Sequence, residues 1–301
     1  MPIDPSVAVG AELAPRTFRW TADNVLLYHL AIGAGSRPGD NVDAAALRYT
    51  LDDDGLQVLP SFAVVAPTFF ETDAPRLDLP GCDIDLQSVL HGSQGVEVHR
   101  PLPTSGSATL NIRITDVWDK GKAAVIVQEG NAYDDASGEL LWTVRSSIFV
   151  RGEGGFGGER GPSAKAELPD RPADASTSYT VTPQQALLYR LCGDRNPLHA
   201  DPAFAKGAGF PAPILHGLCS YGIVLREVTD LMLNGDAAQV GSFSARFAGV
   251  VFPGETIAIS TWDEGDHIAI TATIASDHPD RDGAPVLADC LLTRAAVSLG
   301  T

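Results

Sequence analysis

The chain contains 301 residues, carries a formal net charge of −17 and is 44% apolar, so it can fill one large or two medium hydrophobic cores. Phosphate binding requires clustered Lys and Arg, so this acidic balance predicts neither a nucleic-acid partner nor an anionic membrane surface. The N-terminus lacks the basic and apolar segments of a signal peptide, and no apolar run approaches the roughly 18 residues of a membrane span. Neither classical export nor membrane insertion is expected.

Four cysteines are scattered along the chain without a CxxC pair: Cys82, Cys192, Cys219 and Cys290. Isolated cysteines in mostly apolar surroundings predict reduced thiols, which are typical of a cytoplasmic protein.

The sequence repeats itself on either side of residues 151–176, a stretch rich in Gly, Pro and charge that is typical of a linker. We expect one domain over residues 1–150 and a second over 177–301. Three pairs of fragments recur in the same order: LLYHLAIG at 26–33 with LLYRLCGD at 187–194, LHG at 90–92 with LHG at 215–217, and VWDKGKAAVIV at 117–127 with TWDEGDHIAIT at 261–271. This order indicates a duplicated domain.

Alternating β-branched segments predict antiparallel strands joined by tight turns in each half. They cover residues 108–119, 122–134, 140–150, 255–263, 267–277 and 287–297. One helix is predicted upstream of each set, from LPSFAVVAPTFF at 59–70 and from ILHGLCSYGIVLREVTDLM at 214–232. A long helix against a curled antiparallel sheet is an α+β layer.

The segment GDRNPLH, residues 193–199, occurs only in the second half, although the first half has about 36 more residues between equivalent landmarks. Pro197 disfavours helix, so a helix from about residue 183 is predicted to end near Gly193, leaving Asp194, Asn196 and His199 on a loop. An aspartate and a histidine aimed at one water suit general acid and base catalysis.

Other interpretations of these residues stay open from spacing alone. GDRNP has the composition of an ordinary β-turn. A metal site of His199, Asp201 and His216 matches no usual zinc spacing, and nothing indicates a nucleophilic Cys192 or Cys219. His216 is explained either as a core histidine or as part of a site. Gly217 would expose backbone N–H groups at a helix start, which suits a developing oxyanion.

The block YRLCGDRNPLHADPAFAKGAGFPAPILHGLCSYG resembles the signature of the MaoC-like, hydratase 2 family, specifically the (R)-specific enoyl-CoA hydratase unit of peroxisomal multifunctional enzyme type 2. Segments such as NVLLYHLAIGAG, LQVLPSFAVV, VWDKG and SARFAGVVFPG resemble the family in the family's order, so the likeness covers nearly the whole chain. It implies a double hot-dog fold, a homodimer, and reversible syn hydration of a trans-2-enoyl-CoA without a metal or redox cofactor, which makes the protein a hydro-lyase.

The resemblance also implies roles for single residues. Asp194 and His199 would be catalytic, with Asn196 positioning substrate or water. We assign His199 as the base toward the water and Asp194 as its partner in proton transfer, although the sequence alone does not order these two roles. The remaining ligand contacts would be His91, Gly92, Lys120, Gly217 and Phe247. The family's Tyr-Glu pair before the LPxF segment is absent here, where Asp52, Asp53 and Asp54 stand instead.

Lys120 is informative because Glu264 occupies the matching position of the second repeat. It is interpreted as a contact for the anionic coenzyme A, or else as a solvated lysine in a hairpin. The first half would be a silent repeat that accommodates a long fatty or sterol-derived acyl group, in a cytoplasmic enzyme that stands alone. The competing classes are a non-catalytic acyl-CoA-binding scaffold and a hot-dog thioesterase.

Overall fold

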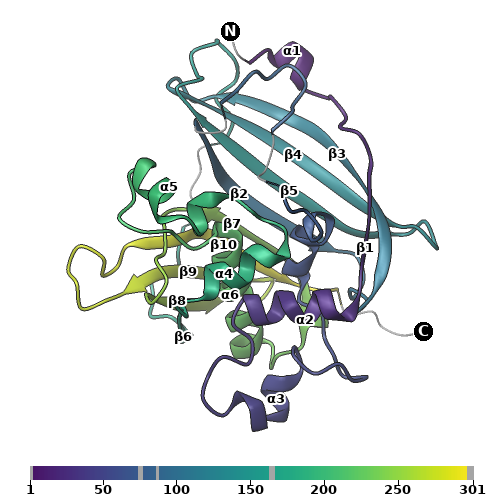
Figure 1. Ribbon diagram of the computed structural model, residues 1–301, viewed down its shortest axis with the longest axis vertical. Coiled ribbons are helices and arrows are strands. Elements are labelled where there is room, and N and C mark those ends of the chain that lie inside the picture. The colour runs from purple at the N-terminus through teal and green to yellow at the C-terminus, as the bar shows by residue number, and fades with distance from the viewer. Residues whose placement is uncertain (1–2, 74–76, 86–87, 163–166, 297–301) are drawn as a thin grey trace.

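The computed structural model describes residues 3–73, 77–85, 88–162 and 167–296. Within these residues the strands form one antiparallel sheet in the order β1-β3-β4-β5-β2-β7-β10-β9-β8-β6 (Figure 1). The strands of the first half are β1 (Arg16–Trp20), β2 (Val89–Val98), β3 (Gly106–Asp119), β4 (Ala123–Asp134) and β5 (Leu140–Arg151). Those of the second half are β6 (Ala175–Thr180), β7 (Val240–Phe247), β8 (Thr256–Asp263), β9 (His267–Ala275) and β10 (Pro285–Arg294).

The strand order is the same when it is read from either edge. The first half contributes β1-β3-β4-β5-β2 and the second half β6-β8-β9-β10-β7, so the halves join where β2 pairs with β7. Ser93 lies opposite Arg246 in that central pair, and Glu97 lies opposite Ser242. This mirrored order is what a duplicated domain would produce, and the six predicted strands are all present.

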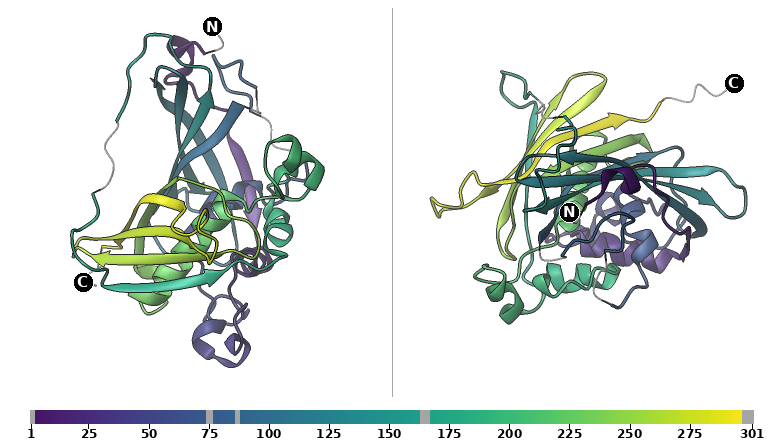
Figure 2. Two further views of the ribbon diagram at one scale, coloured as in Figure 1. Left: turned by 90° about the vertical axis from the view of Figure 1, so that its left-hand side faces the viewer. Right: turned by 90° about the horizontal axis from the view of Figure 1, so that it is seen from above.

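The α-helices lie mainly on one side of the sheet, as the right-hand view of Figure 2 shows. The longer ones are α2 (Ala22–Ala31) and α6 (Gly217–Met232), and the shorter ones are α1 (Pro5–Ala8), α3 (Ala44–Leu47), α4 (Gln185–Tyr189) and α5 (Pro202–Gly207). Within the described residues, no helix is both long and apolar enough to span a membrane.

The helix α6 forms the centre of the core. Every residue from Cys219 to Thr229 is buried, because α6 packs both on the sheet and beneath other helical segments. This burial includes Arg226 and Glu227, whose side chains pair at 2.7 Å, and Glu227 also pairs with Arg37 of the first half at 2.8 Å. A charge buried in the core must be paired to be tolerated, so this ion network joins the two halves.

The predicted helix at residues 59–70 is wrong as a single helix. That segment forms two short 3₁₀ helices, η2 (Pro60–Val64) and η3 (Ala66–Thr68). The cause is Pro67, which has no N–H to donate to the preceding turn and disfavours α geometry at Ala66. The second predicted helix is confirmed as α6, three residues shorter at its N-terminal end.

The match between the two LHG fragments is also wrong in structure. Residues 90–92 lie on β2, whereas residues 215–217 lead into α6. The other two pairs of fragments do fall on equivalent elements: α2 and α4 for one, and the ends of β3 and β8 for the other. A three-residue match carries too little pattern to define an element.

Gly193 lies at a close contact between the two halves. Its φ is +113°, and a Cβ there would lie 1.9 Å from the Thr68 carbonyl oxygen of η3.

We expect Gly193→Ala to reduce the free energy of unfolding by about 2 kcal/mol or more, because it adds a steric clash to left-handed strain. Gly209→Ala is the control: its φ is +89°, but nothing lies within 4 Å of the new Cβ, so about 1 kcal/mol is expected. Urea unfolding measures both, and equal losses would contradict the packing argument.

Candidate active site

The loop after α4 follows the predicted course. After α4 the chain makes one 3₁₀ turn, η5 (Arg190–Cys192), which ends at Gly193. The Asp194 carboxylate then accepts the Asn196 N–H at 3.1 Å, and the Asn196 side chain accepts the Leu198 N–H at 3.0 Å. Asn196 thus caps η6 (Pro197–His199). The segment is therefore a turn that also brings the Asp194 and His199 side chains together, and their catalytic role stays a prediction.

His199 is held in one tautomer. Its Nδ1 donates to the Ile214 carbonyl oxygen at 2.9 Å, because a carbonyl can only accept. In the neutral ring the lone pair is therefore on Nε2, as a base requires. Burial lowers the pKa of His199, and the nearby Asp194 carboxylate opposes part of that shift. The ring therefore favours the neutral, proton-accepting form.

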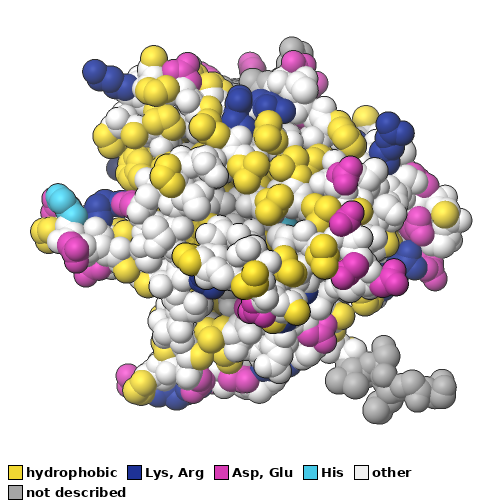
Figure 3. Space-filling model, turned by 60° about the horizontal axis from the view of Figure 1, so that its bottom comes forward, with side chains coloured by type: hydrophobic (Ala, Val, Ile, Leu, Met, Phe, Trp, Pro, Cys, Tyr) yellow, Lys and Arg dark blue, Asp and Glu magenta, His cyan; other side chains and the backbone are white. Residues whose placement is uncertain are grey.

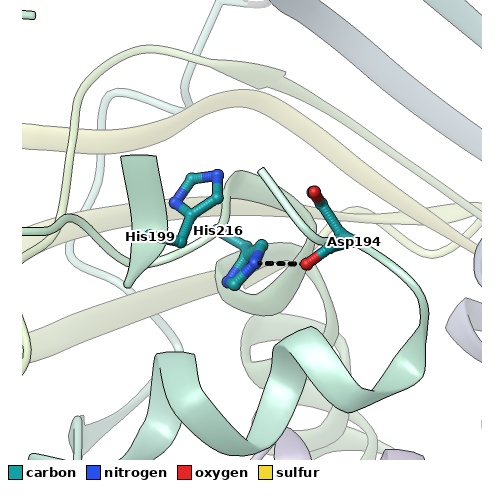
Figure 4. Close-up of side chains that lie close together, drawn as sticks. All are labelled: Asp194, His199 and His216. Carbon is teal, nitrogen blue, oxygen red and sulfur yellow. Dashed lines mark hydrogen bonds between the residues drawn. The ribbon is translucent and has the colours of Figure 1, made fainter. Parts of the chain in front are cut away.

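His216 completes the cluster, although its role stayed open from the sequence. It occupies the N-cap position of α6 without a side-chain capping bond, and its Nε2 lies 3.3 Å from the Asp194 backbone carbonyl. Its ring stacks on His199 with centroids 3.8 Å apart (Figure 4). His216 therefore touches both predicted catalytic residues. The signal that could have found it is the apolar spacing that predicted α6, because that spacing places His216 at the helix start.

Gly217 begins α6 and is exposed. A Cβ at this position would lie 3.1 Å from the Phe247 ring, so glycine allows the ring to approach the helix start. Phe247 is the last residue of β7 and contacts the His91 ring of β2 at a centroid distance of 4.6 Å. Three segments far apart in the sequence therefore meet at the N-terminus of α6.

Gly92 and Lys120 line a groove of about 780 Å³ that crosses the β2–β7 junction. Trp118, Arg145 and Arg246 also line it. The two arginines are paired, Arg145 with Glu129 at 2.8 Å and Arg246 with Asp289 at 2.5 Å. The Lys120 ammonium donates to the Pro162 carbonyl at 2.9 Å and lies 5.3 Å from the Trp118 ring centroid.

The predicted residues thus fall into two groups. Asp194, Asn196, His199 and Gly217 belong to the loop and the start of α6, next to the contact between Phe247 and His91, whereas Gly92 and Lys120 line the groove. Asp52, Asp53 and Asp54 are exposed, and Asp53 accepts the Gly55 N–H in a local turn. They therefore lie apart from the buried cluster.

Asp194, His199 and His216 have potential ligand atoms within 4.8 Å of one another. Their geometry does not favour a shared metal ion, because imidazole lone pairs lie in the ring plane and the two rings are stacked at 28° to one another. Asp201, the third residue of the metal alternative, instead caps α5 by accepting the Ala203 N–H at 2.8 Å.

Comparisons with known proteins identify the family of this chain. Residues 18–152 match the MFE-2 hydratase 2 N-terminal domain, and residues 164–278 match the MaoC like domain. The "Enoyl-CoA hydratase ChsH3" of Mycobacterium tuberculosis is 53% identical over 95% of this chain and 97% of its own. The peroxisomal enoyl-CoA hydratase 2 of Arabidopsis thaliana is 39% identical over 85% of this chain and 86% of its own.

Solved structures of similar proteins superpose on nearly the whole chain. A MaoC-like dehydratase from Phytophthora capsici superposes with a TM-score of 0.86 over 99% of this chain and all of its own, at 28% identity. A Mycobacterium tuberculosis protein described as a double hotdog fold superposes with a TM-score of 0.58 over 97% of this chain and 98% of its own, at 12% identity. The fold is therefore a double hot-dog. The chain belongs to the MaoC-like, MFE-2 hydratase 2 family.

The buried histidines make stability depend on pH. Burial lowers the pKa of His29 to about 4 and lowers those of His199 and His216. The unfolded chain binds these protons near pH 6.5 while the folded chain does not, so the stabilisation is complete above pH 6.5 and is lost as pH falls. We expect His29 alone to lower the free energy of unfolding by about 1.4 kcal/mol for each pH unit by which pH falls between about 6.5 and 4. Urea unfolding at pH 7 and pH 5 tests this, and equal stability at both would contradict it.

Proposed function

We propose that this protein is an (R)-specific enoyl-CoA hydratase that interconverts a trans-2-enoyl-CoA and water with a (3R)-3-hydroxyacyl-CoA. The observation that carries the proposal is the convergence of Asp194 and His199 next to the exposed start of α6. A related hydratase at 53% identity supports the same reaction.

The start of α6 suits the thioester carbonyl. Addition of water to C3 places negative charge on the carbonyl oxygen, and the enolate needs a donor already in position. The first N–H groups of a helix have no partner within the helix and lie at the positive end of its dipole. The Gly217 N–H is our candidate donor, since the residue is exposed and has no side chain to block the substrate.

His199 and Asp194 suit the proton transfers. The free His199 Nε2 takes a proton from water as the water oxygen bonds to C3, and the C2–C3 double-bond electrons move onto the enolate. The His199 proton then passes to the Asp194 carboxylate, which supplies it to C2 as the carbonyl re-forms, so both residues return to their starting states. Hydroxyl and hydrogen then arrive from the same side, which gives syn addition.

The first half has a different role in this proposal. Residues 1–150 form a non-catalytic repeat that accommodates the acyl chain, residues 151–176 are the linker, and residues 177–301 carry the chemistry. The support is that GDRNPLH occurs only in the second half and that the long helix expected in the first half is replaced by η2 and η3. We propose a long fatty or sterol-derived acyl group as the substrate.

The groove beside Gly92 and Lys120 is the proposed place for the nucleotide end of coenzyme A. Its phosphates are anionic, and the rest of the chain is strongly acidic. Arg145 and Arg246 are already neutralised by carboxylates, whereas within the described residues no carboxylate pairs with Lys120. Lys120 is therefore the cation best placed to meet a phosphate.

The catalytic pair is tested by substitution. We expect Asp194→Asn and His199→Gln each to lower kcat by roughly 10² to 10⁴, the usual worth of a general acid or base. Asp201→Asn is the control, because Asp201 lies near in sequence but caps α5. Loss of the enoyl-thioester ultraviolet absorbance measures hydration, with released thiol measured in parallel. Full activity in both variants would contradict the assignment of Asp194 and His199 as catalytic residues.

The same assay separates the other classes. Thiol release without hydration would identify a thioesterase, and neither signal would favour a non-catalytic acyl-CoA-binding scaffold. Enoyl-CoA substrates of increasing length, together with a steroid enoyl-CoA, would define the acyl preference.

We also propose a homodimer in the cytoplasm. Hydrophobic side chains are exposed among polar ones on the face shown in Figure 3. Leu30 on α2, Leu187 on α4 and Leu191 in η5 are exposed apolar residues on segments that contact one another. Exposed apolar surface of this kind often marks a protein interface. Buried thiols at Cys192, Cys219 and Cys290 suit a reducing compartment.

The proposed dimer can be tested by measuring the mass of the protein in solution. We expect light scattering after gel filtration to give twice the chain mass of 31.6 kDa, and Leu187→Glu to shift the protein toward the monomer by burying a charge in the interface. Val42→Glu is the control, since Val42 is an exposed apolar residue on another segment. A wild-type mass of 31.6 kDa would contradict the proposal.

A further inference from the structure

Residues 152–162, called the strap below, follow β5 and lie against the turn between β3 and β4. The strap has no regular secondary structure, yet it is attached at several points along its length. The Gly152 N–H donates to the Lys122 carbonyl at 3.0 Å, and the Glu159 carbonyl accepts the Asp119 N–H at 2.7 Å. Phe156 packs against the smaller hydrophobic cluster of the first half.

The main attachment is the Asp119 side chain. One carboxylate oxygen accepts the N–H groups of Gly121 and Gly155 at 2.7 and 2.8 Å, and the other accepts the Gly157 N–H at 2.8 Å. Asp119 is only 6% exposed. These backbone hydrogen bonds lower the pKa of Asp119, so the carboxylate stays ionised and keeps accepting. One charged side chain therefore binds both the turn and the strap.

The far end of the strap forms part of the groove. Gly161 lies against the Trp118 ring so closely that a Cβ would be 2.2 Å from it. The next residue, Pro162, lines the groove and accepts the Lys120 ammonium at 2.9 Å. The strap thus sets the position of Trp118 and Lys120, and a displaced strap would release the Lys120 side chain.

The second repeat binds a segment to the equivalent turn in a different way. Its Trp262 indole donates to the Arg171 carbonyl at 3.0 Å, and its Asp263 N–H donates to the Asp174 carboxylate at 2.8 Å. Its equivalent of Asp119 is Asp263, which accepts the Gly265 N–H at 3.0 Å and otherwise pairs with Arg294 at 2.7 Å. Its equivalent of Lys120 is Glu264, which pairs with Arg171 at 2.7 Å. Within the described residues, a turn carboxylate that accepts the backbone N–H groups of a neighbouring segment therefore occurs together with the lysine in the first repeat, and neither occurs at the equivalent turn of the second.

We propose that Asp119 is a positioning residue that holds the strap so that Trp118, Lys120 and the Pro162 carbonyl form a wall built in advance for the nucleotide end of the CoA thioester. The inference rests on the proposed hydratase function for its substrate. Asp119 touches neither the substrate nor the reacting atoms. It favours binding because the strap, Trp118 and Lys120 are already held in place, so less conformational entropy is lost when the ligand binds.

The variant Asp119→Asn tests this, because the amide is close in shape but loses the charge and presents an NH₂ group to the strap amides. We expect KM for an enoyl-CoA to rise about tenfold with kcat unchanged. The matching N-acetylcysteamine thioester, which lacks the nucleotide, should keep its kcat/KM. A merely structural loss would lower kcat and affect both substrates alike.

Asp263→Asn is the matched control at the equivalent turn, and it should leave both substrates unchanged. Hydrogen exchange adds a readout that does not depend on activity: the Gly155 and Gly157 amides should exchange faster in Asp119→Asn and not in Asp263→Asn. An unchanged KM with faster exchange would overturn the positioning role, and unchanged exchange would overturn the attachment itself.

A failure of the proposed hydratase function can be distinguished from a failure of the proposed role of Asp119. If the wild-type protein hydrates neither substrate, the proposed function fails. Calorimetry with free coenzyme A then tests the wall alone: a Kd about tenfold weaker in Asp119→Asn would support it. Equal Kd values in the two proteins would contradict it.

Discussion

The site depends on one backbone constraint, which is that the helical segment of α4 and η5 must stop at Gly193. The left-handed φ of +113° ends the segment, and the Thr68 carbonyl leaves no room for a side chain there. Because the chain turns at this point, Asp194 and His199 leave the helix and come to lie against His216 at the start of α6. Gly193 therefore serves both the close contact between the halves and the placement of the catalytic loop proposed for the second half.

The duplicated sheet supplies a scaffold that is symmetric, and function comes from the ways in which the halves differ. The strand order is mirrored about the β2–β7 pair. Among the residues that the structure describes, however, a long central helix occurs only in the second half, which also carries the GDRNPLH loop. The first half has Lys120 where the second half has Glu264, and the strap at the start of the linker binds to Asp119 of the first half. In our account the halves divide the work, one carrying out proton transfer while the other binds the nucleotide and the acyl chain.

The sequence was most informative where local chemistry decides the structure. Strand alternation predicted the six hairpin strands, Pro197 and Gly193 predicted the end of the helix, and GDRNPLH predicted the polar loop. It failed where the outcome depends on distant contacts. The stacking of His216 on His199 is set by the tertiary fold, and no local pattern encodes the binding of the strap by Asp119. The helix expected at 59–70 is a different case, because apolar spacing favours a helix there while Pro67 disrupts it through a purely local effect.

The central claim is that Asp194 and His199 act on one side of the substrate through a single water. The most direct measurement is the configuration of the product formed from an enoyl-CoA in D₂O, determined by NMR at C2 and C3. We expect a single (3R) product with deuterium and hydroxyl added to the same face. An anti product, or a mixture of configurations at C2 formed in the addition itself, would contradict it.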